Sequence, residues 1–455
     1  MKTKNAKVQT DEQIEEDIVL FDDDSEELVS FMRRIGPAVL QELEKNNRSH
    51  AFDGYRVSWQ EEVDTVSRIH SLSHEKLNHE LQVTGLSWNC TGAVIAVAYG
   101  RLDHENWCTH KSALCTWNID RSSLNSSKPD TVIDLSSCLL CVACHPKQPS
   151  LIAGATFNGE VMVWDTSRED ETLVATSGIS DDTHREPVYK LQWVAATDSK
   201  KYNLVSVGGD GRILVWHMSS RKQTLKLVDG FILLTESLPR KERLTARRGD
   251  KEMAVTSLTF SPNDETTFLV GSDSGGIFKC STKTKGTPAS RDVQCSIPLQ
   301  SPVTFSFASH KGPVYSVDFS HFHRNLFLSC STDKSVRIYT VLQSEPVLTL
   351  EPGAEYLYSA KWSPVRPLLF AVGAHDGTLL IYDLRQNRAT PTLRLDAGAK
   401  KEPVFSVEFS HAQPQLLATG DAAGNVAIWR LNSELTQQQN HEQEMLDELA
   451  DVVHE

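Results

Sequence analysis

The chain has 455 residues, of which 39% are hydrophobic and 23% are charged, and its formal net charge is −14. The apolar runs, such as residues 92–99 and 231–234, are far shorter than the roughly 20 residues that a membrane helix needs, so we expect no membrane insertion. Residues 1–5 carry lysines with no apolar core behind them, which predicts no secretory signal and indicates that the nine cysteines are reduced thiols.

The acidic charge is concentrated near both ends of the sequence. Residues 11–27 contain ten acidic side chains and residues 431–455 contain seven, with no lysine or arginine in either segment. Residues 28–430 carry equal numbers of acidic and basic side chains. A nucleic-acid-binding protein is expected to show a basic surface, because contacts with phosphates supply most of its affinity. We therefore expect no nucleic acid among the partners.

An internal repeat covers most of the chain. Seven segments contain a turn with Gly, Asp or Lys and then a short alternating strand that finishes on an aromatic residue or a substitute. The final positions are Trp117, Trp164, Trp216, Cys280, Tyr339, Tyr382 and Trp429. The gaps between them range from 43 to 64 residues, which indicates one unit of 43–47 residues with loop insertions.

Each unit has two further strands upstream of this ending. The first alternates apolar and other residues, and we predict it at 83–88, 139–144, 188–193, 255–260, 314–319, 356–362 and 404–409. The second is an apolar run that closes on small residues, and we predict it at 94–100, 151–155, 204–209, 268–272, 326–331, 369–373 and 416–420. A weaker fourth strand, clearest at 131–135 and 347–350, completes a four-stranded unit.

Repeated four-stranded units are typical of a β-propeller, and these motifs resemble the WD40 family over about residues 81–430. The predicted fold class is all-β, with a seven-bladed WD40 propeller at residues 81–432. The resemblance implies hydrogen-bonded structural braces within the blades. The residues that match the blade pattern are Trp117, Trp164, Asp165, Asp210, Trp216, His310, Asp333, Tyr339, Tyr382 and Trp429. The fourth unit departs most, because Cys280 stands where an indole is expected.

The seventh unit lacks an outer strand, because the sequence after Trp429 is polar. A propeller closes when a strand from one end of the chain pairs with the blade at the other end. This places the missing strand in the linker 51–80, where residues 55–59 and 63–69 are the candidates. We prefer residues 63–69.

Residues 1–27 are polar and acidic without periodicity, which predicts disorder. Within them, Lys7-Val8-Gln9-Thr10-Asp11 resembles the short motif that binds the eight-kilodalton dynein light chain. Such a peptide adds a strand to an exposed sheet edge. The resemblance assigns Val8, Gln9 and Thr10 to light-chain binding, although Ala6 replaces the basic residue that usually precedes the Gln by three positions.

Residues 28–50 carry an apolar stripe at helical spacing. Its members are Leu28, Met32, Ile35, Val39 and Leu43. Because Gly36-Pro37 interrupts the run, we predict two short amphipathic helices, the second with Pro37 in its first turn. Two interpretations stay open for the stripe: it packs against the propeller wall, or it docks onto a separate partner, which we prefer.

Residues 433–455 form an acidic tail that we expect to be helical or disordered. Met445, Leu446, Leu449 and Val453 have helical spacing. The segment is short and strongly acidic, so we expect this weak helix to fray.

The segment 138–145 has cysteine spacing that looks like a metal cluster. Alternation along a regular strand places Cys141 on the opposite face from Cys138 and Cys144, so we interpret these thiols as buried structural residues. Cys108 and His110, in the loop insertion 101–111, are the alternative pair of metal ligands. We expect no bound metal.

Signals for catalysis are missing from the sequence. No phosphate-binding loop of the form Gly-x-x-x-x-Gly-Lys-Ser/Thr occurs, and no Gly-x-Ser-x-Gly nucleophile elbow occurs. We therefore expect no cofactor, no catalytic residue and no enzyme activity.

An acidic head with a light-chain-like motif, then an amphipathic helix, then a divergent WD propeller is the layout of dynein intermediate chains. In this order and in the motifs Tyr55–Trp59, Val161–Asp165 and Val426–Trp429, the sequence resembles the WD-repeat intermediate chains of cytoplasmic dynein-2, the motor of retrograde intraflagellar transport. The resemblance implies that the propeller holds the dynein-2 heavy chain. It also implies that the motif binds the eight-kilodalton light chain and that the helix binds a roadblock-type light chain.

The same resemblance implies a second, different dynein-2 intermediate chain as a partner and a role in cilium assembly. The implied location is the cytoplasm, the cytoskeleton and the cilium, with its axoneme and basal body. The alternative is a WD40 scaffold or substrate receptor in another complex, such as a ubiquitin ligase or a chromatin complex. That alternative predicts no use for residues 1–46.

Overall fold

A computed structural model of the 455-residue chain describes residues 26–48, 65–77, 80–104, 107–196, 201–219, 223–235, 252–284, 295–398 and 401–451. The chain divides into two compact units, Met1–Val63 and Asp64–Glu455. In the first unit the structure describes one helix, α1 (Glu26–Arg48). The second unit is built from strands β1–β28 and ends in two helices, α3 (Ser433–Thr436) and α4 (Glu442–Ala450). Among the described residues, none of the helices is long and apolar enough to span a bilayer.

Five sheets of the second unit have four strands each. The first four contain, in chain order, β2 (Gln82–Trp88), β3 (Val94–Gly100), β4 (Ser112–Asn118) and β5 (Thr131–Leu135); β14 (Val255–Phe260), β15 (Thr267–Ser272), β16 (Ile277–Ser281) and β17 (Val303–Ser306); β18 (Val314–Phe319), β19 (Leu326–Ser331), β20 (Val336–Thr340) and β21 (Pro346–Leu350); and β22 (Leu357–Trp362), β23 (Leu369–Ala374), β24 (Thr378–Asp383) and β25 (Leu393–Asp396). The fifth contains β1 (Val66–Leu72), β28 (Val426–Leu431), β27 (Leu416–Asp421) and β26 (Val404–Phe409).

The sixth sheet has eight strands in two halves. One half contains β6 (Leu139–Cys144), β7 (Leu151–Thr156), β8 (Val161–Asp165) and β9 (Leu173–Thr176). The other contains β10 (Val188–Ala195), β11 (Tyr202–Gly208), β12 (Arg212–Ser219) and β13 (Thr224–Ile232). A single parallel pair, Thr224 with Thr176, joins the halves.

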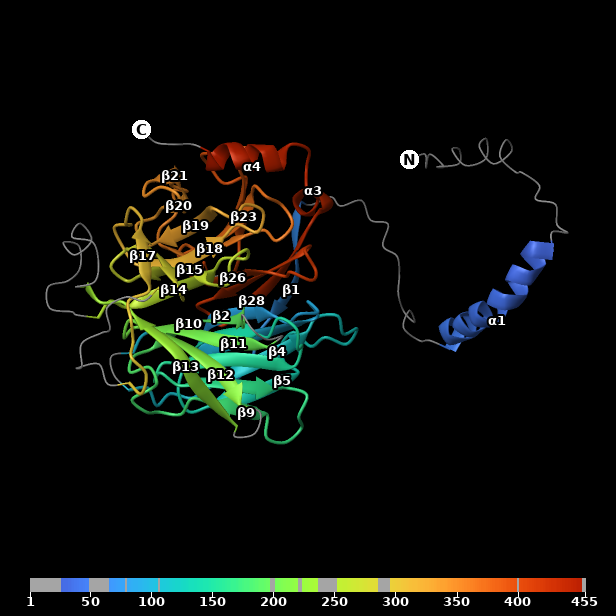
Figure 1. The fold of residues 1–455 in the computed structure, drawn as a ribbon, viewed down its shortest axis with the longest axis horizontal. Helices are drawn as coiled ribbons and strands as arrows, with labels where there is room; N and C mark the ends of the chain where they lie inside the picture. The colour runs from blue at the N-terminus through green and yellow to red at the C-terminus, as the bar shows by residue number, and fades with distance from the viewer. Residues whose placement is uncertain are drawn as a thin grey trace. The chain divides into compact units, whose positions relative to one another are not determined.

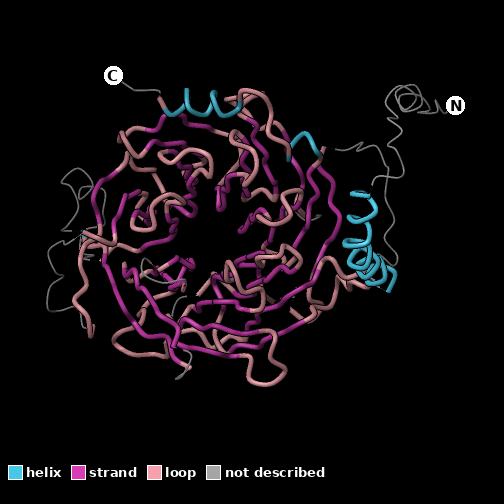
Figure 2. Tube along the Cα trace, turned by 45° about the vertical axis from the view of Figure 1, so that its right-hand side comes forward, coloured by secondary structure: helices cyan, strands magenta, loops and turns pink. Residues whose placement is uncertain are grey.

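The sheets are arranged around a common centre (Figure 2). The first strand of each four-stranded set contacts the next in the order β2, β6, β10, β14, β18, β22 and β26, and β26 contacts β2 again. The predicted all-β WD40-type propeller is thus confirmed as an architecture. The predicted first and second strands also match the observed strands to within two residues at their ends.

Tight turns join the second and third strands of the sheets. Gly377, between β23 and β24, has φ of +79°, a conformation that L side chains rarely adopt. A Cβ atom at this position would lie 2.6 Å from the Cα of Lys401. The glycine is therefore required both for the backbone turn and for close packing against the next sheet.

The first strand of the unit completes the last sheet. β1 pairs antiparallel with β28, from Val66 opposite Leu431 to Leu72 opposite Val426, so blue and red ribbons lie side by side in Figure 1. β1 overlaps the preferred candidate at residues 63–69 and ends three residues later. The other candidate, residues 55–59, lies outside the described residues. This pairing covers the edge of β28, which would otherwise leave unpaired backbone groups.

The hydrophobic core lies between neighbouring sheets rather than within one layer. One cluster brings Leu114 and Ala96 of the first sheet against Leu139, Ile152 and Trp164 of the next. Each sheet thus buries its two faces against its neighbours, which explains why the central strands read as nearly continuous apolar runs.

The expectation of a fraying carboxy-terminal helix is wrong. α4 packs on the propeller, with Leu446 fully buried and Leu449 5% exposed in one cluster with side chains of β19–β24. The Arg366 guanidinium also forms an ion pair with Glu442, the first residue of α4. The acidic composition predicted an unanchored tail because no local pattern indicates that a buried arginine pairs with Glu442.

The expectation of two short helices around Gly36-Pro37 is also wrong. α1 is one continuous helix of 23 residues with Pro37 inside it. Proline removes one backbone hydrogen bond and disfavours a helix interior by about 3 kcal/mol. The flanking sequence is rich in Glu, Leu and Arg, which are strong helix formers, and the helix continues through the interruption.

Candidate interaction surfaces

The predicted light-chain motif, Val8, Gln9 and Thr10, lies outside the described residues. The predicted helical stripe lies on α1. Leu28, Met32, Val39 and Leu43 are 41%, 60%, 49% and 54% exposed, and Ile35 is half-buried. Helical spacing places these five residues on one face. α1 thus presents an apolar face that is largely open to solvent.

The apolar surface of α1 is wider than the sequence analysis indicated. Phe31 is 45% exposed and follows Leu28 by three positions, and Leu40 is 64% exposed and precedes Leu43 by three. Residues three apart are neighbours on a helix surface. The two side chains widen the stripe on opposite sides, and the strict spacing used to find the stripe excluded them. We call this surface, formed by Leu28, Phe31, Met32, Ile35, Val39, Leu40 and Leu43, the α1 face.

The third repeat unit contains a complete hydrogen-bonded brace. His184 Nδ1 lies 3.0 Å from Asp210 Oδ1, and His184 Nε2 lies 2.7 Å from Ser206 Oγ. The Trp216 indole N–H donates to the same hydroxyl at 2.8 Å. The sequence analysis named Asp210 and Trp216, and the structure adds Ser206 and His184, which precedes β10 by the same four positions that separate His310 from β18.

The fifth unit has the same brace with a phenol in place of the indole. His310 Nδ1 lies 2.9 Å from Asp333 Oδ2, and Nε2 lies 2.7 Å from Ser329 Oγ. The Tyr339 hydroxyl donates to the Ala308 carbonyl at 2.8 Å instead of to Ser329. Burial lowers the pKa of His310, so the imidazole is held neutral at neutral pH.

The remaining predicted blade residues are packed without a full brace. Trp429 donates its indole N–H to Thr419 Oγ1 at 3.0 Å. Trp117, Trp164 and Tyr382 are at most 2% exposed, and within the described residues the Trp117 indole nitrogen and the Tyr382 hydroxyl have no hydrogen-bond partner. Asp165 accepts hydrogen bonds from the backbone and hydroxyl of Ser167. Cys280 is fully buried at the corresponding end of β16.

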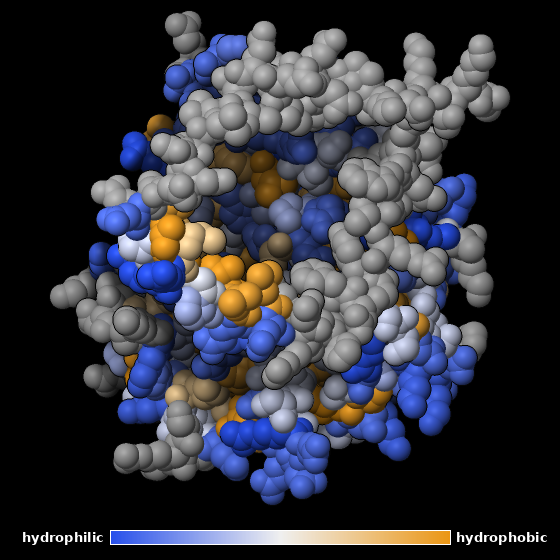
Figure 3. Space-filling model, turned by 90° about the vertical axis from the view of Figure 1, so that its right-hand side faces the viewer, coloured by the Kyte–Doolittle hydropathy of each residue, from blue (hydrophilic) through white to orange (hydrophobic). Residues whose placement is uncertain are grey.

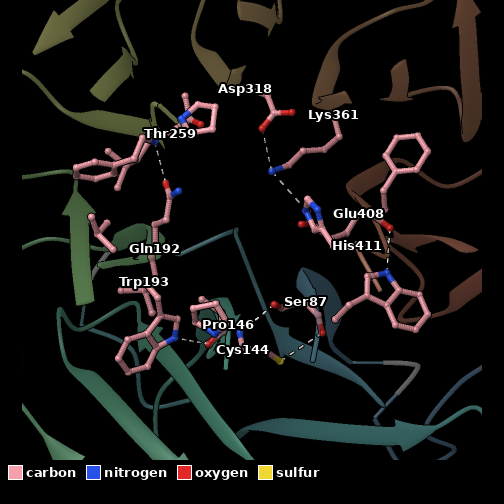
Figure 4. Close-up of a pocket in the computed structure, with 18 of the residues that line it drawn as sticks. Ser87, Cys144, Pro146, Gln192, Trp193, Thr259, Asp318, Lys361, Glu408 and His411 are labelled. Carbon is pink, nitrogen blue, oxygen red and sulfur yellow. Dashed lines mark hydrogen bonds and ion pairs between the residues drawn. The ribbon is translucent and has the colours of Figure 1, made fainter. Parts of the chain in front are cut away.

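A cavity of about 520 Å³ opens at the centre of the ring, where the first strands end. In Figure 4, Lys361 lies between two carboxylates, with its Nζ 3.5 Å from Asp318 and 3.6 Å from Glu408. Burial disfavours the charge of Lys361, but the two carboxylates outweigh it and raise the pKa of the amine. Lys190 also lines the cavity, and burial lowers its pKa.

Hydrogen bonds around this cavity join neighbouring sheets. The Trp193 indole donates to the Ala143 carbonyl at 3.0 Å, and the Trp88 indole donates to the Glu408 carbonyl at 3.1 Å. Asp318 accepts from the Trp362 backbone N–H at 2.9 Å. Each of these polar groups has its partner on the neighbouring sheet, so the bonds hold adjacent sheets together.

Aromatic side chains lie at the opposite ends of four of the first strands. Tyr189 and Tyr315 are 36% and 40% exposed, and each follows the first residue of its strand. The Tyr315 and Tyr358 rings are 5.5 Å apart, and the Tyr358 and Phe405 rings are 5.0 Å apart. We call these four residues the aromatic rim. The sequence analysis missed these aromatic residues, because it treated the second position of each strand only as part of the alternating pattern.

Over the described part of the face in Figure 3, hydrophobic residues gather in small groups among hydrophilic ones. This mixed surface agrees with the equal numbers of acidic and basic residues in 28–430.

Comparison with known families agrees with the architecture. Residues 301–340, which span β17 to β20, match the model of the WD domain, G-beta repeat. The fold and its bracing therefore define a WD-repeat propeller protein.

The relatives define the family more closely. The chain is 44% identical to mouse cytoplasmic dynein 2 intermediate chain 2 over 429 residues, which cover 94% of this chain and 80% of that protein. It is 42% identical to the human protein of that name over 426 residues, covering 93% and 79% of the two chains. It is 27% identical to the ciliary dynein intermediate chain 3 of Heliocidaris crassispina over 427 residues, covering 92% and 66%. The chain belongs to the family of dynein-2 WD-repeat intermediate chains, whose members are non-catalytic subunits.

Proposed function

We propose that this chain is the intermediate chain of a cytoplasmic dynein-2 motor that carries out retrograde intraflagellar transport and supports cilium assembly. The propeller binds the tail of the heavy chain, and the amino-terminal region binds light chains. The observation that carries the proposal is identity above 40% to dynein-2 intermediate chains over more than nine-tenths of this chain.

The propeller in this proposal has seven blades. The eight-stranded sheet counts as two blades, because its halves share only the pair Thr176–Thr224 whereas the strands within each half pair over several residues. The cycle of contacts through β2, β6, β10, β14, β18, β22 and β26 then corresponds to one inner strand for each blade.

The aromatic rim is the part of the propeller best suited to hold the heavy chain. Tyrosine side chains supply large contact areas at little cost in conformational entropy and are enriched at the energetic centres of protein interfaces. Exposed Tyr315 lies beside the half-buried Tyr358, which packs against Phe405, and exposed Tyr189 holds the corresponding position on β10. The exposed tyrosines can thus contact a partner, while the half-buried rings are held in place by their neighbours.

The amino-terminal region holds two kinds of light chain in this proposal. Val8, Gln9 and Thr10 bind the eight-kilodalton light chain, and the α1 face binds a roadblock-type light chain. Each α1 side chain that becomes fully buried contributes roughly 1.5–3 kcal/mol. Dimeric light chains then join this subunit to a second, different intermediate chain, and the linked weak contacts reinforce one another. The complex works in the cytoplasm and the cilium, at the axoneme and basal body.

Co-purification of the tagged full-length protein from ciliated cells tests the proposal. We expect the dynein-2 heavy chain, the second intermediate chain and both kinds of light chain among the bound polypeptides. The double variant Gln9→Ala, Thr10→Ala should lose the eight-kilodalton light chain and keep the heavy chain. The double variant Tyr189→Ala, Tyr315→Ala should lose the heavy chain and keep the light chains.

A ubiquitin-ligase or chromatin scaffold remains the second candidate, since a propeller alone serves many complexes. It predicts no partner for the α1 face. Recovery of ligase or chromatin subunits without dynein subunits would contradict the dynein proposal.

A further inference from the structure

Three side chains with metal-ligating atoms meet at the rim between the first two sheets. The ligand atoms of His104, Cys108 and Cys138 all lie within 4.8 Å of one another. His104 and Cys108 belong to the connection between β3 and β4, and Cys138 immediately precedes β6. His110 lies on the same connection, with its Nδ1 3.8 Å from Cys108 Sγ.

The distances from Cys108 to the two histidines fit a tetrahedral zinc ion. Zinc binds cysteine sulfur at about 2.3 Å and histidine nitrogen at about 2.0–2.1 Å, so tetrahedral angles place sulfur and nitrogen about 3.5 Å apart. Cys108 Sγ lies 3.5 Å from His104 Nε2 and 3.8 Å from His110 Nδ1. Two cysteines and two histidines are one of the standard ligand sets of structural zinc sites.

Neighbouring groups hold these side chains in place, as expected around a metal site. The Asn158 side chain accepts a hydrogen bond from the Cys108 backbone N–H and donates one to the Cys108 carbonyl, both at 2.8 Å. The Phe157 ring packs edge-on against His104, with the ring centres 4.6 Å apart. The turn between β7 and β8 thus fixes a loop that belongs to the preceding sheet.

The hydrogen bonding of Cys108 differs from that of the other clustered cysteines. Cys108 Sγ accepts a hydrogen bond from the Cys138 backbone N–H at 3.3 Å, the kind of contact that orients a metal ligand from outside the site. Cys141 and Cys144 instead donate their thiol hydrogens to the carbonyls of Val188 and Ser87. The latter two remain protonated structural thiols, in keeping with their interpretation from the sequence.

We propose that His104, Cys108, His110 and Cys138 bind one structural zinc ion. This replaces the sequence-based expectation of no metal and joins Cys138 and His104 to the alternative pair, Cys108 and His110. The signal was hidden because Cys138 follows His110 by 28 positions and becomes a neighbour of the loop only when two sheets pack together. The ion fastens the loop that carries Trp107, which is 62% exposed, to the second sheet.

Elemental analysis of the purified full-length protein tests this site. Protein produced with zinc in the medium and dialysed against metal-free buffer should contain about one zinc ion per chain. Cys108→Ser and His104→Ala should each lower the zinc content at least tenfold. Cys90→Ser, which changes a half-buried thiol outside the cluster, should leave the zinc content unchanged.

Cobalt substitution separates loss of the site from loss of the fold. Cobalt(II) added to the zinc-free protein should produce the visible absorption of a tetrahedral thiolate site. His104→Ala alters only a half-buried loop side chain, so it should lose this absorption while keeping the wild-type far-ultraviolet circular dichroism. Less than one-tenth of a zinc ion per reduced wild-type chain, a Cys108–Cys138 disulfide in freshly purified protein, or full zinc retention in all variants would overturn the proposal.

Discussion

Two amphipathic helices outside the blades have opposite environments. α1 exposes about half of the surface of Met32, Val39 and Leu43, whereas α4 buries Leu446 completely and leaves Leu449 only 5% exposed. Both helices carry apolar residues at helical spacing, so periodicity alone does not distinguish them.

One charged residue of the propeller anchors α4. Arg366 is 1% exposed and pairs with Asp383 at 3.1 Å as well as with Glu442. It also donates to the Glu434 carbonyl of α3 at 3.1 Å. Glu442 at the start of α4 thus meets a buried cation. A specific polar anchor accompanies the apolar face of α4 and makes this helix part of the fold.

The largest effect should follow from removing this anchor. Arg366→Ala leaves Asp383 and Glu442 as buried carboxylates without their cation, and loss of one member of a buried ion pair typically costs about 3–5 kcal/mol. Urea unfolding of the full-length protein should show this loss. Arg388→Ala, at an exposed arginine after β24, should change the unfolding free energy by less than about 0.5 kcal/mol. Equal effects of the two substitutions would contradict the anchoring role.

A matched pair of leucines measures the difference between the helices directly. Leu446→Ala should destabilise the protein by about 2–5 kcal/mol, because it opens a cavity in a packed cluster. Leu43→Ala should change the stability of the propeller by less than about 0.5 kcal/mol, because its side chain is 54% exposed. Thermal unfolding of the two variants checks this, and a strong effect of Leu43→Ala would show that α1 is packed in the free protein.

A smaller effect should appear in the pH dependence of stability. Burial lowers the pKa of His310 below 6.5, so the unfolded chain binds a proton more readily than the folded one as the pH falls through 6.5. The contribution of this residue to the unfolding free energy is therefore complete above pH 6.5 and decreases below it. His310→Asn should reduce this acid dependence, whereas His441→Asn, at a largely exposed histidine of α4's N-terminus, should not.

A second decrease in the free energy of unfolding should occur at lower pH, and it arises from Asp333 in the same blade. Burial tends to raise the pKa of Asp333, but the hydrogen bond and charge of His310 outweigh it and hold that pKa well below 3.8. The stabilisation from Asp333 is thus present above pH 3.8 and is lost as the pH falls further. Urea unfolding at a series of pH values measures both windows, and identical acid dependence in wild type and Asp333→Asn would contradict this assignment.

Much of the propeller was predictable because its signals are local. Period-two alternation and turn glycines such as Gly377 placed the inner strands to within two residues. The errors came from contacts between distant residues. The sequence does not reveal that Arg366 meets Glu442 across 76 positions, so α4 was expected to fray. It also does not show that the helix formers around Pro37 keep α1 continuous.

The candidate sites also contain some residues that local sequence patterns reveal and others that only tertiary packing brings together. The α1 stripe was found because helical spacing is a local pattern, although Phe31 and Leu40 were missed. The full brace of His184, Ser206 and Trp216 needed the pairing of β10, β11 and β12 to become visible. The group around Cys108 and Cys138 needed two neighbouring sheets. Residues brought together by tertiary packing are the part that sequence patterns could not supply.

The most direct test of the central proposal is the affinity of the full-length protein for a roadblock-type dynein light chain, measured by calorimetry. Met32→Asp places a charge in the α1 face and should weaken binding at least tenfold. Gln41→Asp makes the same kind of change at an exposed polar position on the opposite side of α1 and should leave the affinity unchanged. Wild-type protein that does not bind the light chain, or equal affinity in the two variants, would contradict the role of α1 as a docking helix.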